Sequence, residues 1–203
     1  MTMNKIKKHL GLALGAIALL ASASLAQAAA SSPMPTTGYT SQPIGHYEFC
    51  KRYAATCGAN ATKAALKLSP AIWKRIVDVN AAVNGNVFPR TDQDIYGVPE
   101  HWAYPTTEGD CEDFVLLKQY MLEREGIPAS ALLITVVKQT NGDGHAVLTL
   151  RTDQGDFVLD NLDNKILAWQ STDYTYLKRQ AVDNAGKWVG IVDDRNLLVG
   201  SVR

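Results

Sequence analysis

Residues 110–137, DCEDFVLLKQYMLEREGIPASALLITVV, decide the organisation of the chain. The first half carries apolar residues at helical spacing, and the second half ends in an apolar run rich in β-branched residues, Ala131 to Val137. Asp110 stands where it can cap a helix, and Gly126 stands where the helical pattern stops. We therefore expect a helix from about Cys111 to Glu125 that is followed closely by a strand.

Three further strands are expected after this one. They are residues 145–150 (HAVLTL), 157–160 (FVLD) and 166–169 (ILAW). The tetrapeptide TDQG at 152–155 separates the first two strands and is a turn signal. Short connections of this kind favour antiparallel pairing.

A second helix is predicted upstream, where Ser69 is a good N-cap, Pro70 suits the first helical position and Gly85 stops the pattern. The stripe expected to face the core consists of Ile72, Trp73, Ile76, Val77, Val79 and Val83. Residues 86–109 look irregular because proline and glycine interrupt any pattern, and such a long loop is often functional. Helices come first and hairpin-linked strands follow, so the expected fold class is α+β with an antiparallel sheet.

The first 28 residues have the pattern of a secretory signal peptide. Three lysines precede the apolar run Leu10–Leu20, and Ala26-Gln27-Ala28 supplies small residues for cleavage after Ala28. The alternative is an uncleaved membrane anchor, but the apolar run is shorter than the roughly 20 residues that a membrane-spanning helix needs. The sequence therefore predicts export into an oxidising compartment.

The exported chain is expected to fold as one domain. Residues 29–43 are rich in Ala, Ser, Pro and Thr and are predicted to form a flexible lead, with the domain at residues 44–203. Without the three lysines of the signal peptide, 17 basic and 20 acidic side chains remain, a net charge of −3. This charge provides no electrostatic reason to expect a nucleic acid partner or binding to an anionic membrane surface.

Three cysteines are present, so at most two of them can pair within the chain. Cys50 and Cys57 are the natural disulfide pair because they close a short loop, although two reduced, buried cysteines remain the alternative. Cys111 is then the unpaired thiol, which needs a reason in an oxidising compartment. At a helix N-terminus, the helix dipole favours its thiolate, which is the nucleophilic form.

A hairpin is expected to bring His145 and Asp160 together. A two-residue or a four-residue loop places Asp160 opposite Val147 and on the face of His145, whereas a three-residue loop places it on the other face. Cys111 would complete a triad in which imidazole activates the thiol and the carboxylate orients the imidazole. The alternative is a buried thiol, a hydrogen-bonded histidine at the sheet edge and a turn aspartate.

A set of short motifs extends over most of the chain. Around the cysteine they are HWAYP (101–105), EGDCEDF (108–114) and GIP (126–128); around the histidine and aspartate they are GHAVL (144–148) and VLDNL (158–162); further motifs are the cysteine segment 49–57, VN at 79–80 and 83–84, and DIYG at 94–97. Together they resemble the bacterial transglutaminase-like cysteine proteinases, which include the LapG-type periplasmic proteases. The resemblance covers roughly residues 44–190.

This resemblance implies a papain-like, transglutaminase-type core in which the nucleophile lies at a helix N-terminus packed on an antiparallel sheet. By resemblance, Cys111 is the nucleophile, His145 the general base and acid, and Asp160 the orienting carboxylate. Trp102 either lines the site, as tryptophans do in transglutaminase-like folds, or packs in the core.

LapG-type members are calcium-dependent, with carboxylates beside the cysteine among the ligands. The corresponding residues here are Asp110, Glu112 and Asp113, although from the residues alone they are better explained as charges that complement the helix dipole. Uncompensated carboxylates raise the pKa of a neighbouring thiol, so a bound cation would favour the thiolate of Cys111.

The resemblance also implies a function. LapG-type proteases clip the N-terminal region of large surface adhesins and so release biofilm, and an inner-membrane cyclic-di-GMP receptor of the LapD type sequesters them. We therefore expect a periplasmic cysteine endopeptidase with these two kinds of partner. The alternatives are an acyltransferase or transglutaminase that uses the same triad, and a non-catalytic calcium-binding adaptor.

Overall fold

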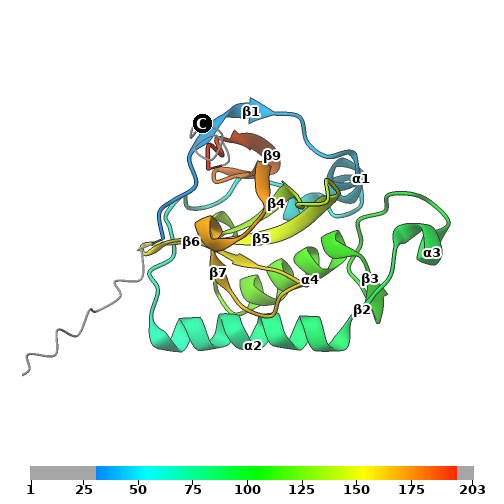
Figure 1. Ribbon diagram of the computed structural model, residues 1–203, viewed down its shortest axis with the longest axis horizontal. Helices are drawn as coiled ribbons and strands as arrows, with labels where there is room; N and C mark the ends of the chain where they lie inside the picture. Colours follow the sequence, from blue (N-terminus) through cyan, green and yellow to red (C-terminus); the bar gives the residue numbers. More distant parts are fainter. Residues whose placement is uncertain (1–30, 196–203) are drawn as a thin grey trace, which may run out of the picture.

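The computed structural model describes residues 31–195, so the predicted signal peptide and the first two residues of the predicted lead lie outside the described residues. Within the described range, no helix is long and apolar enough to cross a membrane. Seven strands pair into one sheet in the order β1-β9-β8-β4-β5-β6-β7 (Figure 1). These strands are β1 (Thr36–Thr40), β4 (Leu132–Lys138), β5 (Gly144–Thr152), β6 (Gly155–Leu159), β7 (Leu167–Ala168), β8 (Thr175–Ala181) and β9 (Asn184–Ile191).

Two long helices stack on one face of this sheet, because α4 (Cys111–Arg124) packs on β4 and β5 and α2 (Pro70–Asn86) packs on α4 (Figure 1). Both predicted helices are confirmed: the hydroxyl of Ser69 caps α2, and Gly126 takes the left-handed conformation (φ +85°) that ends α4. The predicted stripe of α2 is too wide, because Val77 is 40% exposed. The helices and the sheet therefore form the α+β fold that was expected.

The hairpin of β5 and β6 has the predicted register. Thr152 pairs with Gly155 and Arg151 with Asp156 across a two-residue turn, and the pairing is antiparallel. Along both strands of a hairpin, side chains alternate between the two faces of the sheet. This register sets the face and the end of the sheet at which the start of β5 and the end of β6 lie. The site described below is formed there.

Residues 31–43 are not the flexible lead that their composition predicts. β1 pairs antiparallel with β9, and the backbone N–H of Met34 donates to the buried carboxylate of Asp156 (2.9 Å). The side chain of Met34 is buried on the sheet face opposite α4, against Val137 and Val147 among others. Edge pairing and a charge-assisted hydrogen bond therefore fix this segment, even though its sequence is rich in small and turn-forming residues.

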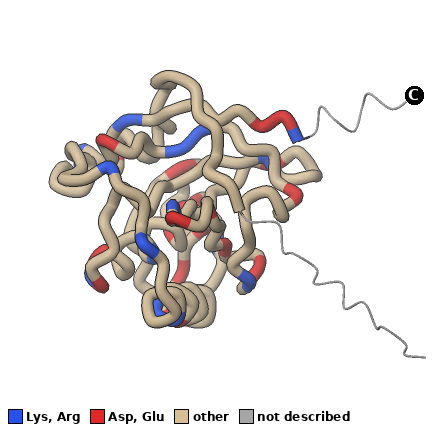
Figure 2. The backbone as a smooth tube through the Cα atoms, turned by 90° about the vertical axis from the view of Figure 1, so that its left-hand side faces the viewer, with Lys and Arg blue, Asp and Glu red and all other residues tan. Residues whose placement is uncertain are grey.

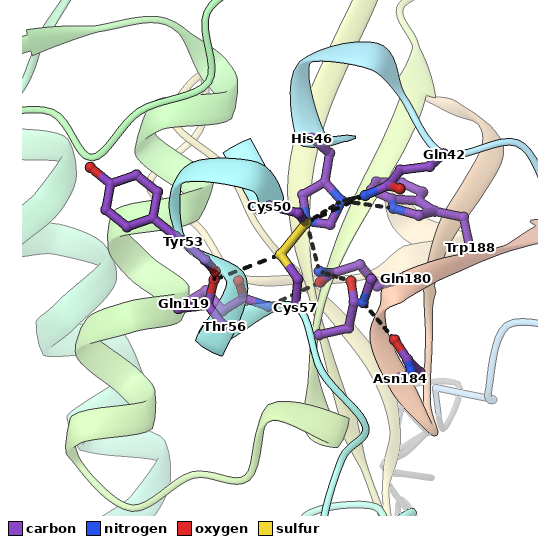
Figure 3. Close-up of a disulfide and its surroundings, with 12 residues drawn as sticks. Gln42, His46, Cys50, Tyr53, Thr56, Cys57, Gln119, Gln180, Asn184 and Trp188 are labelled. Carbon is purple, nitrogen blue, oxygen red and sulfur yellow. Dashed lines mark hydrogen bonds between the residues drawn. A yellow bond between two sulfur atoms is a disulfide. The ribbon is translucent and has the colours of Figure 1, made fainter. Parts of the chain in front are cut away.

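The predicted disulfide between Cys50 and Cys57 is present (Figure 3). It joins α1 (Ile44–Arg52) to the residue that follows the short helix η1 (Ala54–Thr56). His46 lies beside it in α1, where Nδ1 accepts a hydrogen bond from the indole of Trp188 (3.1 Å) (Figure 3). The disulfide therefore belongs to the packing of α1 against β9.

The segment 86–109 is largely irregular, as predicted, but it contains β2 (Phe88–Pro89), the single-turn helix α3 (Asp92–Tyr96) and β3 (Glu108–Gly109). β2 and β3 pair in parallel and lead into the N-terminus of α4. Two more short helices, η2 (Ala129–Ala131) and η3 (Trp169–Ser171), complete the described elements. Basic and acidic residues are interspersed along the chain (Figure 2).

Candidate active site

The structure brings His145, at the start of β5, against Asp160, which follows β6. The Nε2 atom of His145 lies 2.9 Å from Oδ1 of Asp160, and both side chains are buried. Because an ionised carboxylate only accepts hydrogen bonds, Nε2 carries the proton in this pair. Nδ1 of His145 is then the nitrogen left for a thiol.

Further donors hold the carboxylate of Asp160. The backbone N–H of Leu162 donates to Oδ1 (3.0 Å), and the hydroxyl of Tyr174 donates to Oδ2. Burial alone raises the pKa of Asp160, but the hydrogen bonds from His145, Leu162 and Tyr174 outweigh it and hold the pKa below its usual range. The carboxylate is therefore charged at neutral pH.

Cys111 is the free cysteine of the described residues and begins α4. It lines one pocket of about 290 Å³ together with His145. The end of β2 and residues of the β4–β5 and β6–β7 loops also line this pocket. The thiol donates to Oε2 of Glu112 (2.9 Å). Burial, and then the charge of Glu112, raise the pKa of Cys111, so the resting thiol is protonated.

Three carboxylates gather at the N-terminus of α4. Single oxygens of Asp92, Asp110 and Asp113 all lie within 4.8 Å of one another. Burial and then neighbouring negative charge raise the pKa of Asp110 to about 8. The pKa of Asp113 is also raised to about 8, mainly by burial. Gly109 permits this arrangement, because a β-carbon there would come within 2.8 Å of the Asp113 carboxylate.

The three residues predicted as calcium ligands are thus placed differently. Asp110 and Asp113 belong to the carboxylate cluster, whereas Glu112 turns to the thiol. Asp110 occupies the N-cap position of α4, but its side chain makes no capping hydrogen bond, which corrects the expected role. Trp102 packs in the core at 2% exposure, with its indole donating to Glu100, and it is not among the residues that line the pocket of the thiol.

Three residues of the site were missed from the sequence. Asp92 lies in the irregular segment, Tyr174 lies beyond the last predicted strand, and Lys118 is a charged residue that is fully buried in α4. Only Lys118 had a local signal, because it stands among the apolar positions 114–117 and 121–122 of an otherwise amphipathic helix. The other two reach the site through tertiary contacts alone.

Helices packed on an antiparallel sheet, with a cysteine at a helix N-terminus and a histidine at a strand start in one pocket, form a thiol enzyme of the transglutaminase-like class. The chain belongs to the bacterial transglutaminase-like cysteine proteinases, whose family model matches residues 36–196. It is therefore a cysteine peptidase. The match begins at β1, upstream of the boundary predicted at residue 44.

Solved structures of LapG from Legionella pneumophila are similar to this chain. The EGTA-treated form is 27% identical with a TM-score of 0.50, and the match covers 64% of this chain and 76% of that chain. The calcium-bound form is 28% identical with a TM-score of 0.47, over 56% of this chain and 66% of that chain. No curated protein matches the sequence.

Proposed function

We propose that this chain is a periplasmic, calcium-dependent cysteine endopeptidase that cleaves the N-terminal region of a large surface adhesin and so controls biofilm release. The observation that carries the proposal is the buried pair of His145 and Asp160, whose histidine lines one pocket with the free thiol of Cys111. The substrate, the location and a sequestering receptor of the LapD type are inferred from the likeness to LapG-type proteases.

In the acylation step, Nδ1 of His145 takes the proton of the Cys111 thiol, and the thiolate attacks the carbonyl carbon of the scissile bond. Backbone N–H groups at the start of α4 stabilise the oxyanion that forms. The C–N bond then breaks as the imidazolium returns its proton to the leaving amine. A thioester on Cys111 remains, and Asp160 has kept the imidazole oriented throughout.

In the deacylation step, His145 takes a proton from water while the water oxygen attacks the thioester carbonyl. The C–S bond breaks, the proton returns to sulfur and the carboxylic acid product leaves. Overall, one water is added across one peptide bond. An acyltransferase would instead deliver the acyl group to an amine, and the mass of the product separates the two outcomes.

The carboxylate cluster fits calcium. Asp92 Oδ1, Asp110 Oδ1 and Asp113 Oδ2 are buried and have no hydrogen-bond partner among the described residues. Calcium is coordinated by hard oxygen ligands of this kind, several at a time. When bound, it supplies positive charge that offsets the carboxylates beside Cys111, which otherwise oppose the thiolate.

The function is tested by comparing surface proteins of cells that make the parent protein with those of cells that make Cys111→Ala. We expect N-terminal peptide mass spectrometry to find a new N-terminus in one large surface protein, present only with the parent. The two fragments together should exceed the intact protein by one water. Identical sets of N-termini in both strains would refute the endopeptidase assignment.

Calcium should raise the melting temperature of the purified protein by about 5–10 °C at pH 7.5, and EGTA should reverse the gain. The pKa values of Asp110 and Asp113 are raised from 3.8 to about 8 in the metal-free fold. The folded state therefore holds more protons than the unfolded state between those values, and metal-free stability falls as pH rises through this window. The calcium-induced shift should accordingly grow from pH 5 to pH 8.

Asp92→Asn should remove most of this calcium shift, since it deletes a charged ligand without touching the thiol. Asp94→Asn is the matched control, because Asp94 lies in the same helix but is exposed and outside the cluster. Equal calcium shifts in the two variants, or an equal response to magnesium, would contradict the assigned site.

A further inference from the structure

We propose that Tyr174 and Asn84 are positioning residues that hold Asp160 in the orientation that His145 requires. The inference rests on the proposed function, because it concerns the same triad. Neither residue contacts Cys111 among the described contacts, and both form hydrogen bonds to Asp160. Tyr174 bonds to the carboxylate of the aspartate and Asn84 bonds to its main-chain oxygen. The two residues come from elements far apart in the sequence.

Tyr174 fixes the rotation of the carboxylate. Oδ1 of Asp160 faces Nε2 of His145 and the N–H of Leu162, while Oδ2 accepts from the hydroxyl of Tyr174. A carboxylate that is bound on both oxygens cannot turn about χ2 without breaking a hydrogen bond. The Tyr174 ring also lies against the imidazole of His145, with ring centroids 5.5 Å apart.

Asn84 fixes the backbone of the aspartate. Its Nδ2 donates to the main-chain oxygen of Asp160 (2.8 Å) and to Oδ1 of Asn164 (2.7 Å). One turn earlier on α2, Nδ2 of Asn80 donates to the main-chain oxygen of Asn164 (3.2 Å). The two Val-Asn dipeptides of α2 therefore attach both ends of the loop 160–164 to the helix, which gives this motif a role.

The charge of Asp160 is sensitive to the hydrogen-bond donors around it. Asp160 is 5% exposed, so its charge depends on donors rather than on solvent. His145 and Tyr174 face it from β5 and from the residue before β8, and the charge of Asp160 also acts on Lys118 of α4 and on Tyr176 of β8. Without the Tyr174 hydroxyl, Asp160 takes a proton at higher pH, and a protonated Asp160 no longer orients His145 as a charged acceptor.

Matched variants separate positioning from packing. Tyr174→Phe keeps the ring and removes the hydroxyl; its control is Tyr176→Phe, which removes a buried hydroxyl bonded to Thr172 (2.9 Å). Asn84→Asp keeps the shape and removes the donor. Its control is Asn86→Asp, which makes the same charge change on the same helix, where the side chain donates to the main-chain oxygen of Ala82.

The first readout is the rate at which iodoacetamide alkylates Cys111, measured from pH 5 to pH 9 in calcium chloride. We expect Tyr174→Phe and Asn84→Asp to react about tenfold more slowly than the parent at pH 6, with the acid limb of the profile moved to higher pH, and the two controls to follow the parent. Rates within twofold of the parent, or equal losses in the controls, would overturn the proposal.

The second readout is the downfield proton resonance of the His145 Nε2–H, assigned by its loss in His145→Gln and followed in a Cys111→Ala background. As the pH is lowered, this resonance should disappear at a higher pH in Tyr174→Phe and Asn84→Asp than in the background protein. Because this signal needs no substrate, it tests the two residues even if Cys111→Ala proves as active as the parent and the proposed function fails. An unchanged signal in both variants would refute the positioning role.

Discussion

Cys111→Ala should lower peptide-bond cleavage by about 10⁴-fold or more while leaving the fold intact, because no other described side chain can form the thioester. The substitution removes the hydrogen bond from the thiol to Glu112, and it leaves the rest of α4 in place. It also removes a thiol whose ionisation the neighbouring carboxylates oppose. The melting temperature should therefore stay within a few degrees of the parent, and cleavage of a fragment of the surface protein identified by its new N-terminus gives the rate.

The proposed triad also predicts how the effects of two variants combine. Residues that act as one unit are strongly non-additive, so His145→Gln in a Cys111→Ala background should cause little further loss. His101→Gln is the matched control, since this ring contacts Tyr96 instead of the triad and should leave the rate unchanged. If the losses from Cys111→Ala and His145→Gln multiply, the two residues do not act together and the assigned triad is wrong.

The parts of the site that were predicted correctly follow from local patterns. The turn at 152–155 limits the register of the β5–β6 hairpin, and the alternation of side chains then places Asp160 beside His145. A helix that starts at Cys111 and ends at Gly126 is likewise set by spacing and by a terminating glycine. Each of these inferences needs only neighbours in the sequence.

The parts that were missed depend on buried polar residues. In β8, Arg179 and Gln180 are both buried because one pairs with Asp156 and the other bonds to the backbone of β4, so the apolar alternation that signals a strand is absent. Met34 is held by the same Asp156, in a segment whose composition is that of a loop. Such residues are buried for the sake of partners that lie far away in the sequence, and local periodicity does not reveal them.

Lys118→Met should increase the free energy of unfolding by about 2–4 kcal/mol at pH 6. Lys118 is fully buried, and its Nζ has no hydrogen-bond partner among the described residues. Burial lowers its pKa from 10.5 to about 7, although the charge of Asp160 acts in the opposite direction. Methionine has a similar unbranched shape and no charge to bury, so it removes the penalty.

The pH dependence gives the sign of this effect. Below pH 7 both states of the parent are protonated, so the folded state carries the whole penalty of a buried charge. Between pH 7 and 10.5 the unfolded state binds a proton that the folded state lacks, so the parent gains stability as pH rises. The advantage of Lys118→Met measured by urea unfolding should therefore shrink from pH 6 to pH 9. A constant or growing advantage would contradict the assignment.

The exposed Lys74, which pairs with Asp78 at the surface, is the matched control, and Lys74→Met should change stability by less than about 1 kcal/mol at either pH.

The activity of the same variants tests why a destabilising lysine is present. Lys118 supplies positive charge near Asp160 only while it is protonated, so Lys118→Met should lose activity at pH 6 and lose less at pH 8. If Lys118→Met is more stable but less active at pH 6, Lys118 is the buried counter-charge of the proposed triad. If the variant is more stable and fully active at both pH values, Lys118 does not have that role.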